Sequence, residues 1–233
     1  LNDNFSYGFG VSIQYLEAKL SNAVDFGLLS AIGVIPIGAA IPQGNDGFTT
    51  ADGDSWGYGF NLGFLYEFDE SKRLGFAYRS KISHEVDGDV SWTLPADVAP
   101  LNAGGLFTNG GVEVDIDLPS SASLSYYQDV NSKLSVMADV SWTEWSVLDK
   151  LVLDYADNTS NGESVYDWDD TFRYSVGMAY QYNEKCKLRV GIAYDETPIP
   201  NEEKRNVRVP GEDRIWFTLG GSHKFSDAWT LDA

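Results

Sequence analysis

The sequence predicts an all-β protein whose antiparallel strands run up and down to form a transmembrane β-barrel. Two observations lead to this fold class. Large apolar side chains recur at every second position over spans of membrane-crossing length, and short turns alternate with long loops along the chain. Because alternate residues of a strand point to opposite faces of a sheet, each such strand has one apolar face and one small or polar face.

The clearest strand lies at residues 56–68. It alternates seven large apolar side chains with small or polar ones, and the apolar set is Trp56, Tyr58, Phe60, Leu62, Phe64, Tyr66 and Phe68. The same alternation predicts seven further strands, at residues 5–15, 74–78, 112–126, 134–142, 172–182, 188–194 and 215–219. A tilted strand needs about 9–11 residues to cross hydrocarbon, whereas strands of soluble proteins average nearer 5–6.

The strand at 112–126 contains a proline, Pro119. We expect its apolar register to continue unchanged through this proline. The lipid-facing residues would then be Val112, Val114, Ile116, Leu118, Ala122, Leu124 and Tyr126.

The connections between these strands alternate in length. Short turns are predicted at 69–73, 129–133, 183–187 and 226–227, and long loops at 21–55, 83–111, 148–167 and 196–213. Outer-membrane barrels have short periplasmic turns and long external loops. The pattern therefore favours a barrel over a soluble Greek-key protein, in which nothing sorts the loops by length.

Composition limits the classes of function. The net charge of −19 is unsuited to nucleic-acid binding, which needs a basic surface. The single cysteine, Cys186, excludes an internal disulfide framework. The most apolar stretch, residues 24–41, is interrupted by glycines and a proline, so it predicts no transmembrane helix. We expect residues 1–233 to form one β-barrel domain that is incomplete at both ends, because the chain starts without Met and a new strand begins near Leu231.

Several segments resemble the FadL-type family of outer-membrane long-chain fatty acid and hydrocarbon transport proteins. They are Trp56-Gly57-Tyr58-Gly59-Phe60-Asn61, Tyr78-Arg79-Ser80, Trp142-Thr143-Glu144-Trp145-Ser146, Tyr194-Asp195-Glu196-Thr197-Pro198-Ile199-Pro200 and Asp213-Arg214-Ile215-Trp216. The resemblance implies a fourteen-stranded barrel with an N-terminal hatch, of which this chain would supply about eight strands. It also implies passive uptake of hydrophobic molecules across the outer membrane of a Gram-negative bacterium.

One predicted external loop, residues 23–43, is unusually apolar. Water-exposed apolar patches usually mark binding sites, so we expect this loop to capture the ligand, although its side chains could also pack on neighbouring loops. In fatty-acid members of the family, the equivalent loop helps to form the surface groove. The candidate residues are Val24, Phe26, Leu28, Leu29, Ile32, Val34 and Ile35, with Ile37 and Ile41 nearby.

A second group of candidates lies on the predicted lumen strands. Basic side chains there could hold a carboxylate by charge-assisted hydrogen bonds, and aromatic ones could hold a ring. The lumen candidates are Arg79, Lys81, Arg173, Tyr174, Arg189 and Trp216, and the glycines between them would leave room for a ligand. The basic residues near the head group in fatty-acid members align with Asn22 and Ser164 here, so a neutral hydrocarbon is an alternative ligand.

No catalytic arrangement is visible around His84 or His223, and we expect His84 at a strand edge. Acidic pairs such as Asp52 and Asp54 match no complete calcium loop, so no metal or cofactor is expected. The protein is predicted to be a monomeric transporter rather than an enzyme. Its partners would be a hydrophobic small molecule, outer-membrane lipid and lipopolysaccharide. Two other functions stay open from sequence: a general polar porin, and a secreted carbohydrate-binding β-protein.

Overall fold

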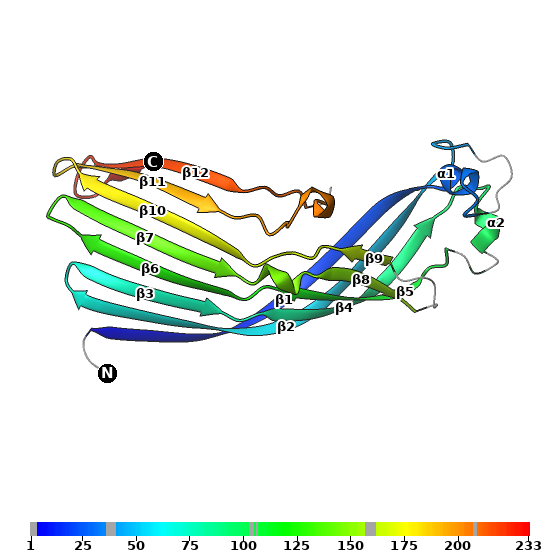
Figure 1. The fold of residues 1–233 in the computed structure, drawn as a ribbon, viewed down its shortest axis with the longest axis horizontal. Helices are drawn as coiled ribbons and strands as arrows, with labels where there is room; N and C mark the ends of the chain where they lie inside the picture. The colour runs from blue at the N-terminus through cyan, green and yellow to red at the C-terminus, as the bar shows by residue number, and fades with distance from the viewer. Residues whose placement is uncertain (1–3, 36–40, 103–104, 106, 157–161, 207–208) are drawn as a thin grey trace.

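The computed structural model describes residues 4–35, 41–102, 105, 107–156, 162–206 and 209–233. Within these ranges thirteen strands form one antiparallel sheet, and two short α-helices lie at one end of it (Figure 1). No helix in the described ranges has the length and apolarity that a membrane crossing requires. The elements are β1 (Phe5–Asp25), α1 (Phe26–Ala31), β2 (Asp46–Asp69), β3 (Lys72–Arg79), β4 (Ile82–Thr93), α2 (Ala99–Asn102), β5 (Gly110–Leu118), β6 (Ser121–Asp129), β7 (Leu134–Thr143), η1 (Trp145–Val147), β8 (Lys150–Tyr155), β9 (Gly162–Val165), β10 (Thr171–Gln181), β11 (Cys186–Asp195), η2 (Glu202–Lys204), β12 (Arg214–Lys224) and β13 (Thr230–Asp232).

The sheet is an up-and-down meander in which four long strands are broken in two, into β3 and β4, β5 and β6, β7 and β8, and β9 and β10. β3 and β4 both pair with β2, on the same side of it, while β6 pairs with β3 and β5 pairs with β4. β7 and β8 continue the pattern next to β6 and β5. Counted as whole strands, the meander has the eight predicted strands plus β13, so the all-β, up-and-down fold class is confirmed. Among the described residues the sheet is open, with no pairing between β1 and β13.

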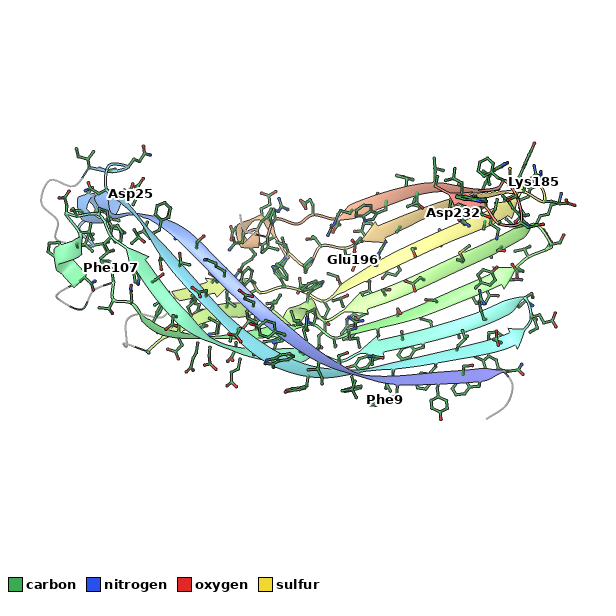
Figure 2. All side chains as sticks on the ribbon, turned by 180° about the vertical axis from the view of Figure 1, so that it is seen from behind. Phe9, Asp25, Phe107, Lys185, Glu196 and Asp232 are labelled. Atoms are coloured by element: carbon green, nitrogen blue, oxygen red, sulfur yellow. The ribbon has the colours of Figure 1, made fainter. Side chains whose placement is uncertain are left out.

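The breaks divide the molecule into two parts (Figure 1). We call the broad part the wall; it consists of β3, β6, β7, β10, β11 and β12 with residues 5–15 of β1 and 56–69 of β2. The extension consists of β4, β5, β8 and β9 with the remainder of β1 and β2, and it carries α1 and α2 at its tip. Figure 2 shows Asp25 and Phe107 together at this tip and Lys185 and Asp232 at the opposite end of the molecule.

The predicted short turns are confirmed, but the predicted long loops contain strands. β1 and β2 remain paired from Tyr15↔Trp56 up to Asp25↔Asp46, inside what the sequence predicted as one loop. β4 likewise occupies residues 83–93 of the predicted loop 83–111, and β8 with β9 form a hairpin inside residues 148–167. Acidic residues alternate with apolar ones in β4 and β5, and these acidic positions made residues 83–93 resemble an exposed loop.

The wall has the polarity that the sequence predicted. One row of cross-strand neighbours is apolar from β1 to β12, and each of its side chains is at least 38% exposed: Tyr7, Phe64, Phe76, Leu124, Val140, Tyr174, Tyr194 and Ile215. The neighbouring row, on the opposite face, is small or charged: Gly8, Gly63, Ala77, Ser123, Ser141, Arg173, Asp195 and Arg214. The first row suits contact with hydrocarbon and the second suits water.

The extension has the opposite polarity. Its buried core faces the same side as the polar face of the wall and contains Val86, Val90, Val112 and Val114. Its other face carries a row of carboxylates directly opposite one another on five adjacent strands: Glu17, Asp54, Asp87, Glu113 and Asp154. Like charges in such a row repel each other, so this face belongs in water and outside hydrocarbon.

The inversion of polarity occurs at a line of breaks that we call the seam, at residues 80–81, 119–120 and 144–149. Arg79 and Ile82 lie on the same face although they are three positions apart, so the alternation shifts by one residue between them. Pro119, which has no N–H to donate, lies at the matching break in the next strand. The prediction that Val112, Val114, Ile116 and Leu118 face lipid was therefore wrong, because the register reverses between Leu118 and Ser121.

Two serines, Ser80 and Ser120, make hydrogen bonds at the seam through both their backbone and their hydroxyl groups. Ser80 N–H donates to the Phe60 carbonyl, and the Ser80 hydroxyl accepts from the Phe60 N–H, both at 2.9 Å. The Ser120 carbonyl accepts from the Glu144 N–H at 3.0 Å, and the Ser120 hydroxyl donates to the Glu144 carboxylate at 2.5 Å. Buried backbone groups are thus satisfied where the strands change direction.

Two glycines of β2 allow the seam to close. A Cβ atom on Gly57 would lie 2.5 Å from Ile82 Cγ2 and 2.6 Å from His84 Cε1, and one on Gly59 would lie 2.7 Å from Ile82 Cγ1. The sequence suggested that the lumen glycines would leave room for a ligand. At Gly57 and Gly59 this space is instead filled by Ile82 and His84. His84 is 1% exposed and not at an exposed strand edge, and neither ring nitrogen has a partner among the described residues.

The opposite polarity of adjacent positions on β10 can be tested in the full-length protein. Val176 lies on the apolar face and Ser175 on the polar face. We expect Val176→Arg to lower the free energy of unfolding from lipid vesicles by about 2–4 kcal/mol, because a midplane arginine would face hydrocarbon. Ser175→Arg should have a much smaller effect. Equal losses for the two variants would contradict the assignment of faces.

The close packing at the seam gives a second prediction. Gly57→Ala should lower the free energy of unfolding by about 1–3 kcal/mol, because the added methyl overlaps Ile82 and His84. Gly63→Ala, six residues along the same strand and on the same face, is the matched control, since a Cβ atom there has open space. Urea titration of both variants in vesicles measures the difference; a Gly63→Ala loss as large as that of Gly57→Ala would contradict the account.

Candidate ligand-binding site

The polar face of the wall encloses a hollow of about 970 Å³, a volume in the usual range for ligand pockets. Its floor is made of small or hydroxyl side chains on the central strands, among them Gly63, Ala77, Ser123 and Ser141. Small residues at these positions leave the space above the sheet open. Arg79, Arg173 and Arg214 lie around this floor, together with the carboxylates of Asp195 and Glu196.

An aromatic cluster forms the end of the hollow nearest the seam. Trp145 and Trp168 meet edge to face, with 5.3 Å between their ring centroids, and Tyr166 meets Trp168 at 5.5 Å. Ile199 and Trp168 are 7% and 8% exposed, and both line the hollow with Pro198. The hollow therefore has an apolar end and a polar floor, which suits a molecule with one part of each kind.

Hydrogen bonds to a carboxylate hold the base of this cluster. Asp170 accepts from the Ser146 N–H and from Trp142 Nε1, both at 3.1 Å. The bond from Ser146, with the weaker one from Trp142, holds the pKa of Asp170 below its ordinary value. Asp170 therefore stays ionised at neutral pH and fixes η1, the short helix that contains Trp145.

The predicted lumen residues fall into different places. Arg79 and Arg173 line the hollow. Arg189 and Trp216 line a second depression of about 740 Å³ nearer the short turns, where Arg189 pairs with Asp232 at 3.4 Å. Lys81 lies at the seam and forms an ion pair with Asp117 at 2.7 Å, so it is not part of the hollow.

Tyr174 was predicted in the lumen and the structure places it on the apolar face. It pairs with Val140 and Tyr194, and 44% of it is exposed. The alternation itself predicts this face, since Tyr174 lies two residues from Val176. The Trp145–Trp168 cluster was not predicted as a site at all, because only the long-range pairing of β7 with β10 brings these residues to the end of the hollow.

The apolar loop divides into buried and exposed residues. Phe26 and Ile35 are 0% and 5% exposed and form a small core with Val98, against which Val24 and Leu29 pack. Phe26 also meets Phe107 edge to face at 5.1 Å. Leu28, Ile32, Val34 and Ile41 remain exposed at the tip of the extension, and we call them the tip patch. The buried residues therefore pack within the tip as the alternative interpretation predicted, and ligand capture stays a prediction for the exposed ones. Residues 36–40, including Ile37, lie outside the described ranges.

The start of α1 fixes the tip patch in position. Asp25 accepts from the Leu28 N–H at 2.8 Å as the helix N-cap, and its second oxygen accepts from the Gln43 N–H at 2.9 Å. Asn45 in turn donates to Asp97 at 3.0 Å and ties this loop to the one that holds Val98. The exposed apolar side chains are thus presented on a supported loop.

Comparison with known proteins gives relatives over the whole chain. The chain is 29% identical to the long-chain fatty acid transport protein of Escherichia coli O6:H1, over 100% of this chain and 55% of that protein. It is also 29% identical to a 47 kDa outer membrane protein of Pasteurella multocida, over 94% of this chain and 52% of the relative. The chain thus spans about half the length of these relatives.

Solved structures give the same result. A FadL homologue from Pseudomonas aeruginosa superposes with a TM-score of 0.82 at 28% identity, over 100% of this chain and 55% of that chain. The toluene transporter TbuX of Ralstonia pickettii superposes with a TM-score of 0.64 at 20% identity and supports the fold.

A family model described as outer membrane protein transport protein (OMPP1/FadL/TodX) matches residues 1–233. This match agrees with the family resemblance found in the sequence and favours a transport protein over a polar porin or a carbohydrate-binding protein. The chain belongs to the OMPP1/FadL/TodX family of outer membrane transport proteins.

Proposed function

We propose that the protein takes up hydrophobic small molecules across the bacterial outer membrane without energy input and without chemical conversion of the ligand. The candidates are long-chain fatty acids and aromatic or aliphatic hydrocarbons. The observation that carries the proposal is the hollow itself, which joins an apolar aromatic end to a polar floor on the side of the wall away from lipid. The match of the family model to residues 1–233 also supports the proposal.

The tip patch is the proposed place of first contact. Its four apolar side chains are between 46% and 69% exposed, and their burial against a ligand would supply affinity at about 25 cal/mol per Å² before the costs of binding. The hollow would receive the ligand afterwards. Because the tip patch lies at the far end of the extension, a ligand would meet it before the membrane surface (Figure 1).

The proposed partners follow from the polarity of the outward faces of the wall and the extension. The apolar face of the wall would contact outer-membrane lipid and, in the outer leaflet, lipopolysaccharide. The carboxylate row on the extension would stand above this layer in water and would repel the same face of a second copy, which supports a monomer.

The capture role can be tested by uptake measurements in cells that carry the full-length protein. We expect the triple variant Leu28→Ser, Ile32→Ser, Val34→Ser to lower the initial uptake rates of oleate and toluene about threefold to tenfold, since burial of each methylene contributes ~0.8 kcal/mol. Val165→Ser is the matched control, because Val165 is 46% exposed on β9 and lies outside the tip patch. Unchanged uptake by the triple variant, or an equal loss with Val165→Ser, would rule out capture at the tip patch.

A further inference from the structure

The loop between β11 and β12 forms one side of the hollow. Its first residues, Glu196 to Ile199, line the hollow together with Pro210 and Gly211 near its end. Figure 2 shows Glu196 at the end of the wall nearest the extension, where this loop begins. We call residues 197–204 the strap; it runs from the base of the loop to the end of the short helix η2.

Hydrogen bonds fix the base of the strap. Asp213, just before β12, accepts from the Thr197 N–H at 2.9 Å and from the Tyr194 hydroxyl at 2.6 Å. The Glu196 N–H donates to the Phe172 carbonyl at 3.2 Å. The two ends of the loop are therefore tied to each other and to β10, so any movement of the strap must occur beyond Thr197.

Ile199 of the strap fills part of the aromatic end of the hollow. It is 7% exposed and forms one apolar core with Tyr166 and Trp168, against which Trp145 also packs. Prolines on both sides of Ile199 restrict the backbone that presents it. A hydrocarbon segment of similar size would bury a similar apolar area at this place, so a ligand can replace Ile199 at little net cost.

Two contacts hold the strap to the segment that follows β9. Lys204 forms an ion pair with Asp167, and the Asp169 N–H donates to the Pro198 carbonyl at 2.8 Å. The hydrogen bond from Lys204, with one from Asp149, holds the pKa of Asp167 below its ordinary value, so this carboxylate stays ionised at neutral pH. Because 47% of the Asp167 side chain is exposed, water weakens the ion pair and leaves it able to open.

The closed arrangement carries two local costs beside this ion pair. Asp167 has a φ of 47°, in the left-handed region that residues other than glycine rarely occupy. The indole N–H of Trp168 is buried and has no hydrogen-bond acceptor among the residues that the structure describes. Opening the strap would expose this N–H to water or to an acceptor on a ligand. Backbone strain of this kind is concentrated in segments that switch between two arrangements.

We propose that the strap closes the aromatic end of the hollow with Ile199, and that it opens when a hydrophobic ligand takes the place of Ile199 against Trp145 and Trp168. The ion pair of Lys204 with Asp167 is the latch of the closed state. The inference rests on the proposed uptake function and adds the step that admits the ligand. A polar solute gains no apolar burial by displacing Ile199, so the exchange also selects apolar ligands.

Cross-linking across the latch tests the proposal in cells that carry the full-length protein. Asp167→Cys and Lys204→Cys are combined in a Cys186→Ser background, and a short bis-maleimide with a reducible bridge joins the two thiols. We expect the link to lower the initial uptake rates of oleate and toluene about tenfold or more, and dithiothreitol, which cleaves the bridge, to restore them. Saturating toluene should slow formation of the link about threefold or more, because the ligand holds the strap open.

The matched control is a link between Lys150→Cys and Glu163→Cys. These residues form another external ion pair, at 3.9 Å in the β8–β9 hairpin, and lie outside the strap. The control link should leave the uptake rate within about twofold of the unlinked rate.

Two single variants with the same change of charge test the latch without a cross-linker. Lys204→Gln should raise the initial uptake rate about twofold to fivefold, the range expected from loss of an exposed ion pair that stabilises only the closed state. Lys150→Gln should leave the rate unchanged.

The outcomes separate the strap from the proposed function. If the native protein takes up oleate and toluene and the latch link does not slow uptake, or the control link slows it equally, the strap proposal is wrong while hydrophobic uptake stands. An unchanged rate for Lys204→Gln, or a link that forms as fast with toluene as without it, would also overturn the proposal. If the native protein takes up neither compound, the proposed function fails, and the strap proposal fails with it.

Discussion

The structure depends on one constraint: a strand that passes from hydrocarbon into water must exchange the polarity of its two faces. In lipid, every backbone polar group must be paired and the outward side chains must be apolar. Above the membrane the outward side chains must be polar, and the apolar ones must turn inward to form a core. β1 and β2 make this exchange without a break, by a change in the residue types on their two faces, whereas the next two strands make it by shifting their alternation by one residue. The shift of one residue between Arg79 and Ile82, and the matching break at Pro119–Ser120, accomplish it in those two strands.

The seam explains features that otherwise look unrelated. Ser80 and Ser120 make hydrogen bonds at the breaks, and Gly57 yields the space into which Ile82 and His84 pack. β2 passes through the seam without a break, and its residue types change there: residues 50–55 are acidic or small, whereas residues 56–68 carry the aromatic register. The same line of breaks ends the polar floor and begins the aromatic end of the hollow, because η1 lies at the β7–β8 break. The two-part character of the hollow is therefore a consequence of the change of solvent along the strands.

The sequence predicts the wall well because the alternation of apolar and polar residues along a strand is visible between neighbouring residues. Each residue of Trp56–Phe68 fixes the face of the next, and the short turns set which strands are neighbours. The inversion could not be read in this way. Val112 to Leu118 and Ala122 to Tyr126 are all even-numbered apolar positions, so the pattern looks continuous although Pro119 and Ser120 reverse the face between them. The hollow was predicted in part. Arg79 and Arg173 follow from the polar register, whereas the contribution of Trp168 and Ile199 depends on loops brought together by packing.

The membrane boundary, the hollow and the tip patch are all placed relative to the seam, so the reversal of faces is the claim to test most directly. Nitroxide labels at each position from 112 to 126 of the full-length protein in vesicles, read for accessibility to oxygen in lipid and to a nickel chelate in water, measure it. The account predicts that positions 122, 124 and 126 are accessible from lipid, that 113, 115 and 117 are accessible from water, and that 112, 114 and 116 are protected from both reagents. Lipid accessibility at the even positions on both sides of Pro119 would contradict it.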